Sequence, residues 1–249
     1  MNRLNGKVAL VTGAGGVIGR GICATLASEG AAIACVDLNE PSCRETVQLI
    51  EQAGGTARAY AVDITQRAAV HALVDQVDRD FGRLDTVVNN AMWVNYQPIA
   101  AVDEDTVDRM FGIGLKALMW MTQAAEPLLA RQGGAIINVS SMAATRVTPN
   151  RMVYTTVKAG VEGLTRETAV ELGPRGIRVN GIAPGLVLHE ASARRMGPEA
   201  VEQRRQSTPL GRLALPDDMG RVVLFLASDD SQFVSGTTIP VDGGRWTAA

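Results

Sequence analysis

Apolar runs of strand length alternate with helical stretches along nearly the whole chain of 249 residues. This alternation is typical of βαβ units, whose parallel strands need helices on both faces of the sheet. A chain of this length can bury a full core, so we expect residues 1–249 to form one α/β domain with a doubly wound parallel sheet of the Rossmann type. The predicted strands lie near residues 7–12, 31–36, 57–62, 84–90, 133–140, 177–182 and 237–241.

The longest predicted helix begins after Asp103, an N-cap followed by acidic residues, and ends near Ala130. Within it, residues 118–121 form an apolar stripe that either packs on the sheet or takes part in a subunit contact. Residues 186–215 are the exception to the regular alternation. The long helix has one apolar face at helical spacing, made of Val107, Met110, Phe111, Leu115 and Leu118.

The first predicted strand runs into a glycine-rich segment, residues 12–19, and then into a helix. Glycines there let the backbone turn tightly and approach a pyrophosphate, which the free N–H groups of a helix start can bind. The segment alone fits an ordinary strand-to-helix turn almost as well. Asp37 favours the dinucleotide interpretation, because a carboxylate at the end of the second strand can accept both ribose hydroxyls.

Asp37 also predicts which dinucleotide binds. Its charge would repel the 2′-phosphate of NADP, and no Lys or Arg lies between Gly13 and Gly19 or directly after Asp37. The sequence therefore favours NAD over NADP.

Tyr154 and Lys158 lie one helical turn apart, so a phenol and an ammonium share one face. A phenol has a pKa of about 10. A fixed cation lowers that pKa, so the tyrosine can act as an acid or base at working pH. Ser141, which follows the fifth strand, offers a hydroxyl to a substrate oxygen. Taken singly, these residues fit a half-buried aromatic, a solvated charge and a turn residue equally well.

The motifs occur in an order that resembles the short-chain dehydrogenase/reductase family, over residues 7–244. Ser141 precedes Tyr154 by 13 residues, the spacing usual in that family. The shared segments are Thr12-Gly13 with Gly19, Asp63, Asn89-Asn90-Ala91, Ser141, Tyr154 with Lys158, Arg178-Val179-Asn180 before Pro184-Gly185, and Asp242-Gly243-Gly244.

The resemblance implies reversible hydride transfer between NAD(H) and a secondary alcohol or ketone. It implies that Tyr154 is the general acid or base, that Lys158 lowers the tyrosine pKa and bonds the nicotinamide ribose, and that Ser141 holds the substrate oxygen. It also implies a homotetramer, with residues 186–215 as a lid over the substrate. The cofactor-binding residues that it implies are Gly13, Gly16, Val17, Ile18, Gly19, Asp37, Leu38, Asp63, Ile64, Asn90, Ala91, Tyr154, Lys158, Pro184, Gly185, Val187 and His189.

Four positions depart from the family pattern. Val17 replaces a glycine of the nucleotide loop, and Met92 replaces a glycine after the fourth strand. His189 replaces a threonine that bonds the nicotinamide carboxamide, and a solvated histidine is an equal alternative. Gly114 replaces the fourth catalytic residue, an asparagine, and we expect an additional water to occupy the space and carry protons from Lys158. Gly114 and Val17 leave a rival open: a catalytically retired member that binds NAD(H) as a sensor or scaffold.

Composition restricts the other partners. The net charge of −2 and pI near 5.8 indicate no basic surface for nucleic acid or an anionic membrane, and we expect a cytoplasmic protein. The spacing of the cysteines and histidines predicts no metal site, and we expect reduced cysteines with Cys35 in the core. The substrate is an unidentified small molecule, apolar or ring-bearing, with Arg146 as a possible anchor for an acid group. Candidate substrate residues are Met92, Trp93, Tyr96, Met142, Arg146, Met152 and Leu186.

Overall fold

The computed structural model describes residues 2–248, apart from the side chains of residues 190, 191 and 195. Within that part, seven parallel strands form one sheet, which confirms the predicted fold class. The strands are β1 Val8–Thr12, β2 Ala32–Asp37, β3 Thr56–Ala61, β4 Thr86–Asn89, β5 Gly134–Val139, β6 Ile177–Pro184 and β7 Thr238–Val241.

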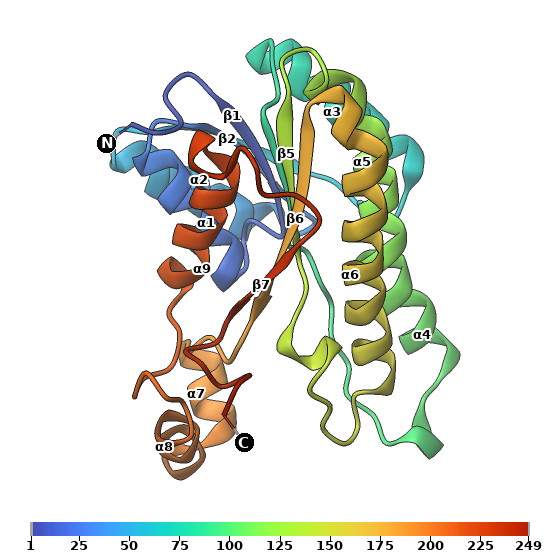
Figure 1. The fold of residues 1–249 in the computed structure, drawn as a ribbon, viewed down its shortest axis with the longest axis vertical. Helices are drawn as coiled ribbons and strands as arrows, with labels where there is room; N and C mark the ends of the chain where they lie inside the picture. The colour runs from blue at the N-terminus through green and yellow to red at the C-terminus, as the bar shows by residue number, and fades with distance from the viewer. Residues whose placement is uncertain (1, 249) are drawn as a thin grey trace.

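The strand order is β3-β2-β1-β4-β5-β6-β7 (Figure 1). The chain winds outward from β1 to β3 and then returns to pair β4 with the other side of β1. In doubly wound sheets a ligand binds outside the carboxyl ends of the strands where the winding reverses. The reversal here lies between β1 and β4, so the topology places a site at the carboxyl ends of these two strands.

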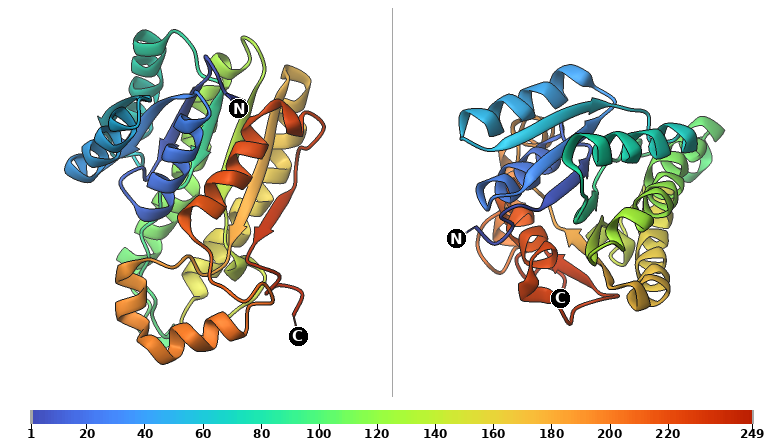
Figure 2. Two further views of the ribbon diagram at one scale, coloured as in Figure 1. Left: turned by 90° about the vertical axis from the view of Figure 1, so that its left-hand side faces the viewer. Right: turned by 90° about the horizontal axis from the view of Figure 1, so that it is seen from above.

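Helices cover both faces of the sheet (Figures 1 and 2). One layer holds α1, α2 and α9, and the opposite layer holds α3, α4, α5 and α6. The helices are α1 Val17–Ser28, α2 Glu40–Gln52, α3 Arg67–Phe81, α4 Glu104–Phe111, α5 Ala117–Leu129, α6 Met152–Leu172, α7 Glu190–Met196, α8 Pro198–Gln206 and α9 Pro216–Ala227. Short 3-10 turns occur at Ile99–Ala101, Met142–Ala144, Gly173–Arg175 and Asp229–Ser231.

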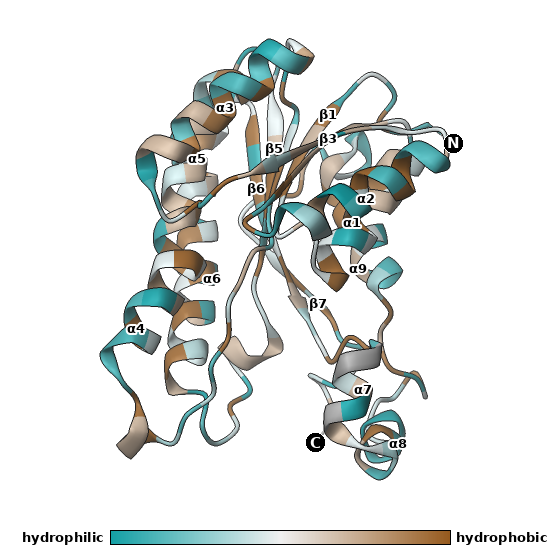
Figure 3. Cartoon of the chain, turned by 180° about the vertical axis from the view of Figure 1, so that it is seen from behind, coloured by the Kyte–Doolittle hydropathy of each residue, from teal (hydrophilic) through white to brown (hydrophobic). Residues whose placement is uncertain are grey.

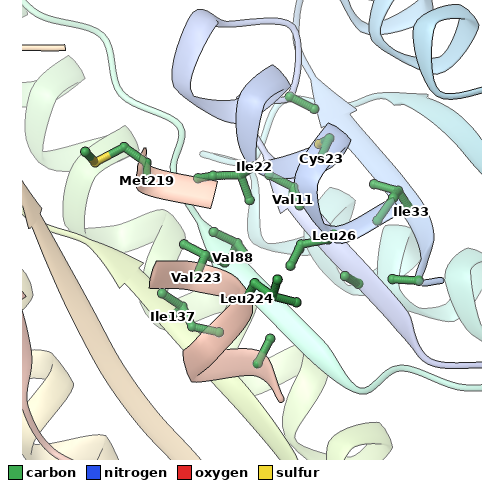
Figure 4. Close-up of a cluster of buried hydrophobic side chains, with 14 of the residues drawn as sticks. Val11, Ile22, Cys23, Leu26, Ile33, Val88, Ile137, Met219, Val223 and Leu224 are labelled. Carbon is green, nitrogen blue, oxygen red and sulfur yellow. The ribbon is translucent and has the colours of Figure 1, made fainter. Parts of the chain in front are cut away.

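Alternate side chains of the strands pack on the two helix layers. Ala9 and Val11 of β1 join the core beneath α1 and α9, whereas Val8 and Leu10 join the core beneath α3, α5 and α6. Figure 4 shows the first of these cores, where Ile22 and Leu26 of α1 and Val223 and Leu224 of α9 meet the sheet. Burial on both faces explains why the strands read as continuous apolar runs. The outward faces of the surface helices are hydrophilic (Figure 3).

The predicted helix over residues 103–130 is not one regular helix. Asp103 is the N-cap, as predicted, and its Oδ1 accepts a hydrogen bond from the Thr106 backbone at 2.7 Å. A π-helical turn, Gly112–Lys116, then separates α4 from α5, and α6 is the longest regular helix among the described residues. Glycine lowers helix stability by about 1 kcal/mol, so two glycines in this turn allow the irregular geometry.

Residues 118–121 are buried only in part, and the predicted subunit contact stays a prediction. Leu118 and Met121 are buried against the sheet, while Met119 is 42% exposed and Trp120 is half-buried. The segment over residues 186–215 is more regular than expected, because it folds into α7 and α8. In the described part of the chain, no helix is long and apolar enough to span a bilayer.

Candidate active site

A cavity of about 1040 Å³ opens at the carboxyl ends of β1, β4, β5 and β6. It lies at the reversal of the winding, where the topology places a ligand. The predicted catalytic residues Ser141, Tyr154 and Lys158 all line it. Every residue predicted to bind the cofactor also lines it: Gly13, Gly16, Val17, Ile18, Gly19, Asp37, Leu38, Asp63, Ile64, Asn90, Ala91, Tyr154, Lys158, Pro184, Gly185, Val187 and His189.

The glycine segment forms a tight turn between β1 and α1. Gly13 has a φ of +65°, and a Cβ at Gly19 would lie 2.1 Å from the Gly13 carbonyl oxygen, so neither position accepts a side chain. Helix α1 begins at Val17 after an N-cap glycine, without a capping side chain or an acidic residue in its first turn. Its first N–H groups therefore remain available to an anion in the cavity. Val17 is the first residue of α1, and its side chain is 40% exposed.

Hydrogen bonds join the end of β1 to the end of β4. The Thr12 hydroxyl accepts from the backbone N–H groups of Asn90 and Ala91, at 3.0 and 3.1 Å. The Asn90 side-chain amide donates to the Thr12 carbonyl oxygen at 2.9 Å. These bonds hold the floor of the cavity between the two strands at the switch point.

Asp37 is fixed at the end of β2 by two backbone donors. Its Oδ2 accepts from Gly15 N at 3.0 Å and its Oδ1 from Asn39 N at 2.9 Å. A carboxylate has about four acceptor sites, so both oxygens keep capacity for ribose hydroxyls. Arg109 and Lys158 are the only cationic side chains among the described residues that line the cavity. Both belong to the chain beyond β4, whereas Asp37 ends β2.

The predicted catalytic residues come from β5 and α6. Ser141 follows β5, and its Oγ accepts from Ala143 N at 3.1 Å. Tyr154 lies in the first turn of α6, and Lys158 is one turn further on. The Lys158 ammonium lies 5.9 Å from the centre of the Tyr154 ring and donates to the Val139 carbonyl oxygen at 2.7 Å.

The pKa values of this pair differ from the expectation. Burial raises the pKa of Tyr154 to about 12, because desolvation of the phenolate outweighs the lowering by a hydrogen bond with Ser141 and by the charge of Arg151. Burial also lowers the pKa of Lys158 to about 8. Lys158 does not contribute to this shift, so its predicted lowering of the tyrosine pKa stays a prediction. The lysine ammonium is buried and directed to Val139, and the half-buried Tyr154 lies beside it.

The expected water beside Gly114 has no room. A Cβ on Gly114 would lie 2.4 Å from Val157 Cγ1 and 2.9 Å from Met92 Sδ. Gly114 is buried in the π-helical turn, and Met92 and Val157 belong to an apolar cluster around Met110. The departures at residues 92 and 114 are therefore linked, because the methionine side chain occupies space that an asparagine at residue 114 would need.

His189 caps helix α7, a role that neither of the two interpretations included. Its Nδ1 accepts from Ser192 N at 3.4 Å and the Ser192 hydroxyl accepts from His189 N at 3.0 Å, a reciprocal N-cap of α7. Because His189 also lines the cavity, the cap places the imidazole at the cofactor wall.

The predicted substrate residues are only partly brought together. Met92 and Trp93 line the cavity, and the Tyr96 ring packs edge-on against Tyr154 with centroids 5.6 Å apart. Met142, Arg146, Met152 and Leu186 do not line it. The cavity residues that sequence reasoning missed are Val36, Asn39, Val62, Val94, Arg109, Ile113, Val139 and Ser140. Most of these adjoin strand ends, which could have identified them, whereas Arg109 and Ile113 carry no such signal.

Cys23, Cys35 and Cys43 are free and buried, so Cys35 is confirmed as a core residue. Among the side chains that the structure describes, no three His, Cys, Asp or Glu residues gather where they could hold a metal ion.

A doubly wound sheet with Ser141, Tyr154 and Lys158 in its switch-point cavity is the arrangement that the sequence resemblance implies. Residues 13–245 match a family model described as enoyl-(acyl carrier protein) reductase. The chain belongs to the short-chain dehydrogenase/reductase family.

Characterised proteins of this type resemble the chain along nearly its full length. Galactitol 2-dehydrogenase of Agrobacterium fabrum is 38% identical over 256 residues, covering 98% of this chain and 99% of that protein. The crystal structure of an NAD+-bound xylitol dehydrogenase superposes with a TM-score of 0.92 at 34% identity, over 97% of this chain and 99% of that one. A 7α-hydroxysteroid dehydrogenase complexed with NADH and 7-oxo glycochenodeoxycholic acid gives 0.93 at 36% identity, over 98% and 95%.

Proposed function

We propose that this oxidoreductase transfers a hydride between NAD(H) and a secondary alcohol or ketone. The observation that carries the proposal is that Ser141, Tyr154 and Lys158 line the same cavity as the glycine turn and Asp37. A catalytic group and a dinucleotide cradle in one cavity are what such a reaction needs.

The residues present fit NAD. The uncapped start of α1 suits a pyrophosphate, and a Cβ at Gly19 would fill the close approach that the turn provides. Asp37 suits the two hydroxyls of an unphosphorylated ribose. The similar xylitol and 7α-hydroxysteroid dehydrogenases were solved with NAD+ and NADH, which supports the same cofactor here. When bound, NAD(H) supplies or accepts the hydride.

The side chains divide the proton chemistry among them. Tyr154 exchanges the proton of the substrate hydroxyl as general base in oxidation and general acid in reduction. Ser141, which lines the same cavity as Tyr154, holds the same substrate oxygen. Lys158 places a positive charge beside the phenol of Tyr154. When the Tyr154–Lys158 pair has lost one proton, this charge favours the form in which Tyr154 is the phenolate.

Three finer features belong to the same proposal. Residues 186–215 act as a lid, since Val187 and His189 reach the cavity from the base of α7. The protein is a cytoplasmic homotetramer, and Met119 on α5 and Val170 on α6, 42% and 77% exposed, are apolar groups that a partner subunit could cover. Three free, buried cysteines fit a reducing compartment.

A direct spectrophotometric assay tests the proposal. The protein is incubated with NAD or NADP and a panel of secondary alcohols, alditols, cyclic diols and hydroxysteroids, and NADH absorbance is recorded. We expect turnover with NAD and an affinity for NADP weaker by on the order of tenfold or more, with Asp37→Ala narrowing that gap. Tight NAD binding without turnover on the whole panel would instead favour the retired sensor or scaffold.

A further inference from the structure

A group of arginines lies outside the cavity, at the carboxyl end of the sheet. Arg146 and Arg151 belong to the segment between β5 and α6, Arg204 to α8, and Arg245 to the C-terminal segment. Figures 1 and 2 show α7, α8 and the C-terminal segment at the same end of the molecule as the segment that precedes α6. We call these four residues the rim arginines.

Hydrogen bonds join the three segments. Arg146 donates to the Trp246 carbonyl oxygen, and Arg245 donates to the Ser207 hydroxyl at the end of α8. Leu210 N donates to the Gly243 carbonyl oxygen at 3.1 Å, which ties the segment after α8 to the C-terminal segment. The segments that carry Arg146, Arg204 and Arg245 are therefore tied to one another.

The rim arginines have no acidic partner. Most other arginines of the described residues form an ion pair with a carboxylate, but Arg146, Arg151, Arg204 and Arg245 form none. The nearby acids are engaged elsewhere. Glu202 pairs with Arg205 at 2.5 Å, and Asp242 accepts from the backbone of Gly244 and Trp246.

Burial and like charge act together on Arg204. Desolvation lowers its pKa, and the charges of Arg245 and Arg151 lower it further. Bringing cations together without a counterion is unfavourable, and a bound anion removes the repulsion. The chain as a whole carries a net charge of −2, so this is a local accumulation rather than a basic protein.

Arg151 links this rim to the reacting centre. Its guanidinium lies 4.8 Å from the centre of the Tyr96 ring, and that ring is 5.6 Å from the Tyr154 ring. Its charge also acts on Tyr154. A substrate whose hydroxyl meets Tyr154 can therefore extend past Tyr96 toward the guanidinium of Arg151. Exposed apolar side chains, Met152 at 45% and Leu210 at 71%, accompany the charges.

We infer that the rim arginines bind an anionic group of the substrate, remote from the carbon that is oxidised or reduced. The inference rests on the proposed function and adds the substrate class: a hydroxy or oxo compound with an apolar body and a terminal carboxylate or phosphate. Guanidinium groups bind both anions through paired N–H donors. The carboxylate and phosphate forms are separate arms of the test.

The test compares matched substrates. One series consists of hydroxy acids whose secondary hydroxyl and carboxylate lie at opposite ends of saturated chains of increasing length. The second contains the primary amides of the same compounds, and the third replaces the carboxylate with a phosphate monoester. We expect one chain length at which an acid exceeds its amide in kcat/KM by about tenfold or more, mainly through KM, with the advantage falling as salt rises.

Two variants isolate the rim. Arg204→Gln and Arg151→Gln should each abolish most of the advantage of the acid over the amide, and Arg204→Gln should leave turnover of the amide in place. Arg205→Gln is the matched control, because Arg205 is the neighbouring arginine on α8 but pairs with Glu202. Equal kcat/KM for acids and amides at every length, or an advantage that survives Arg204→Gln and Arg151→Gln, overturns the inference and leaves the proposed function intact.

The failure of the proposed function has a different signature. If no compound of any series is turned over, calorimetric titration of the protein with the oxo acids and their amides still tests the rim. Salt-sensitive binding of the acids, lost in Arg204→Gln and kept in Arg205→Gln, supports the anion site without catalysis. Equal or absent binding of acids and amides overturns it.

Discussion

The cofactor wall and the substrate rim of this protein are built differently. The wall, formed by the ends of β1, β2 and β4, is held by backbone geometry: the Gly13 turn, the Thr12–Asn90 hydrogen bonds and two backbone donors to Asp37. The rim, formed by the segment before α6, by α8 and by the C-terminal segment, instead presents long side chains that lack acidic partners. A wall made by backbone has to be the same for every substrate, whereas a rim made by side chains can change with the substrate.

Replacing the phenol of Tyr154 tests whether its hydroxyl is needed for turnover but not for binding of NAD at the cofactor wall. Tyr154→Phe removes the hydroxyl and keeps the ring, so turnover should fall by about 100- to 10,000-fold while NAD affinity stays within experimental error. Steady-state kinetics and calorimetry give the two readouts.

The two other tyrosines of the chain provide controls. Tyr96→Phe keeps the ring that packs against Tyr154, and Tyr60→Phe removes a hydroxyl that donates to Asp80 at 2.7 Å on the edge strand β3. Both should retain turnover. A Tyr154→Phe enzyme that remains as active as these controls would mean that another group handles the proton.

The difference between wall and rim also explains what the sequence could predict. The strands follow from apolar runs, and the residues of the cofactor wall follow from glycines and strand ends, because both are imposed by backbone sterics. Arg109 and Arg151 could not be found in this way. Nothing in their local sequence distinguishes them from surface arginines, and only the fold brings them to the cavity and to Tyr96.

Gly114 shows a second limit of sequence reasoning. A glycine in place of an asparagine suggests empty space, but the space is filled by Met92, which is distant in sequence, and by Val157. Compensation of this kind is a property of packing and cannot be read from one position. The pKa of Tyr154 shows the same limit. The spacing of the sequence predicts that Lys158 lies near Tyr154, but burial decides the direction in which the tyrosine pKa moves.

Gly114→Asn tests that packing. The new Cβ would lie 2.4 Å from Val157 Cγ1, so we expect a loss of about 1–3 kcal/mol in the free energy of unfolding, measured by urea denaturation. Met92→Gly opens part of the space that the asparagine needs, so the double variant Met92→Gly/Gly114→Asn should recover part of that loss.

The double variant also distinguishes crowding from chemistry. If Gly114→Asn unfolds as readily in the presence of Met92→Gly as without it, residues 92 and 114 are not coupled. If the wild type shows no turnover, and Gly114→Asn keeps full stability and shows turnover, the chain is a retired enzyme.

The pH dependence of turnover tests the buried pair of Tyr154 and Lys158. Burial lowers the lysine pKa to about 8 and raises the tyrosine pKa to about 12, so below about 8 the pair keeps both protons. Alcohol oxidation needs a base, and the pair becomes one by losing a single proton, which both groups share. The value of kcat/KM for oxidation should therefore rise by about tenfold per pH unit below pH about 8 and level off above it. Ketone reduction needs the proton and should be level below that pH and fall above it.

Lys158→Met assigns the break in the oxidation profile. Without the ammonium, the first proton must leave the phenol itself, so the break should move upward toward the tyrosine pKa of about 12, and oxidation near neutral pH should slow accordingly. Arg151→Gln is the matched comparison from the rim, because Arg151 lowers the tyrosine pKa through charge alone. It should raise the break slightly and leave the slope unchanged. A break that stays at the same pH in Lys158→Met would show that the lysine does not share the proton, and that the wall contributes only the phenol.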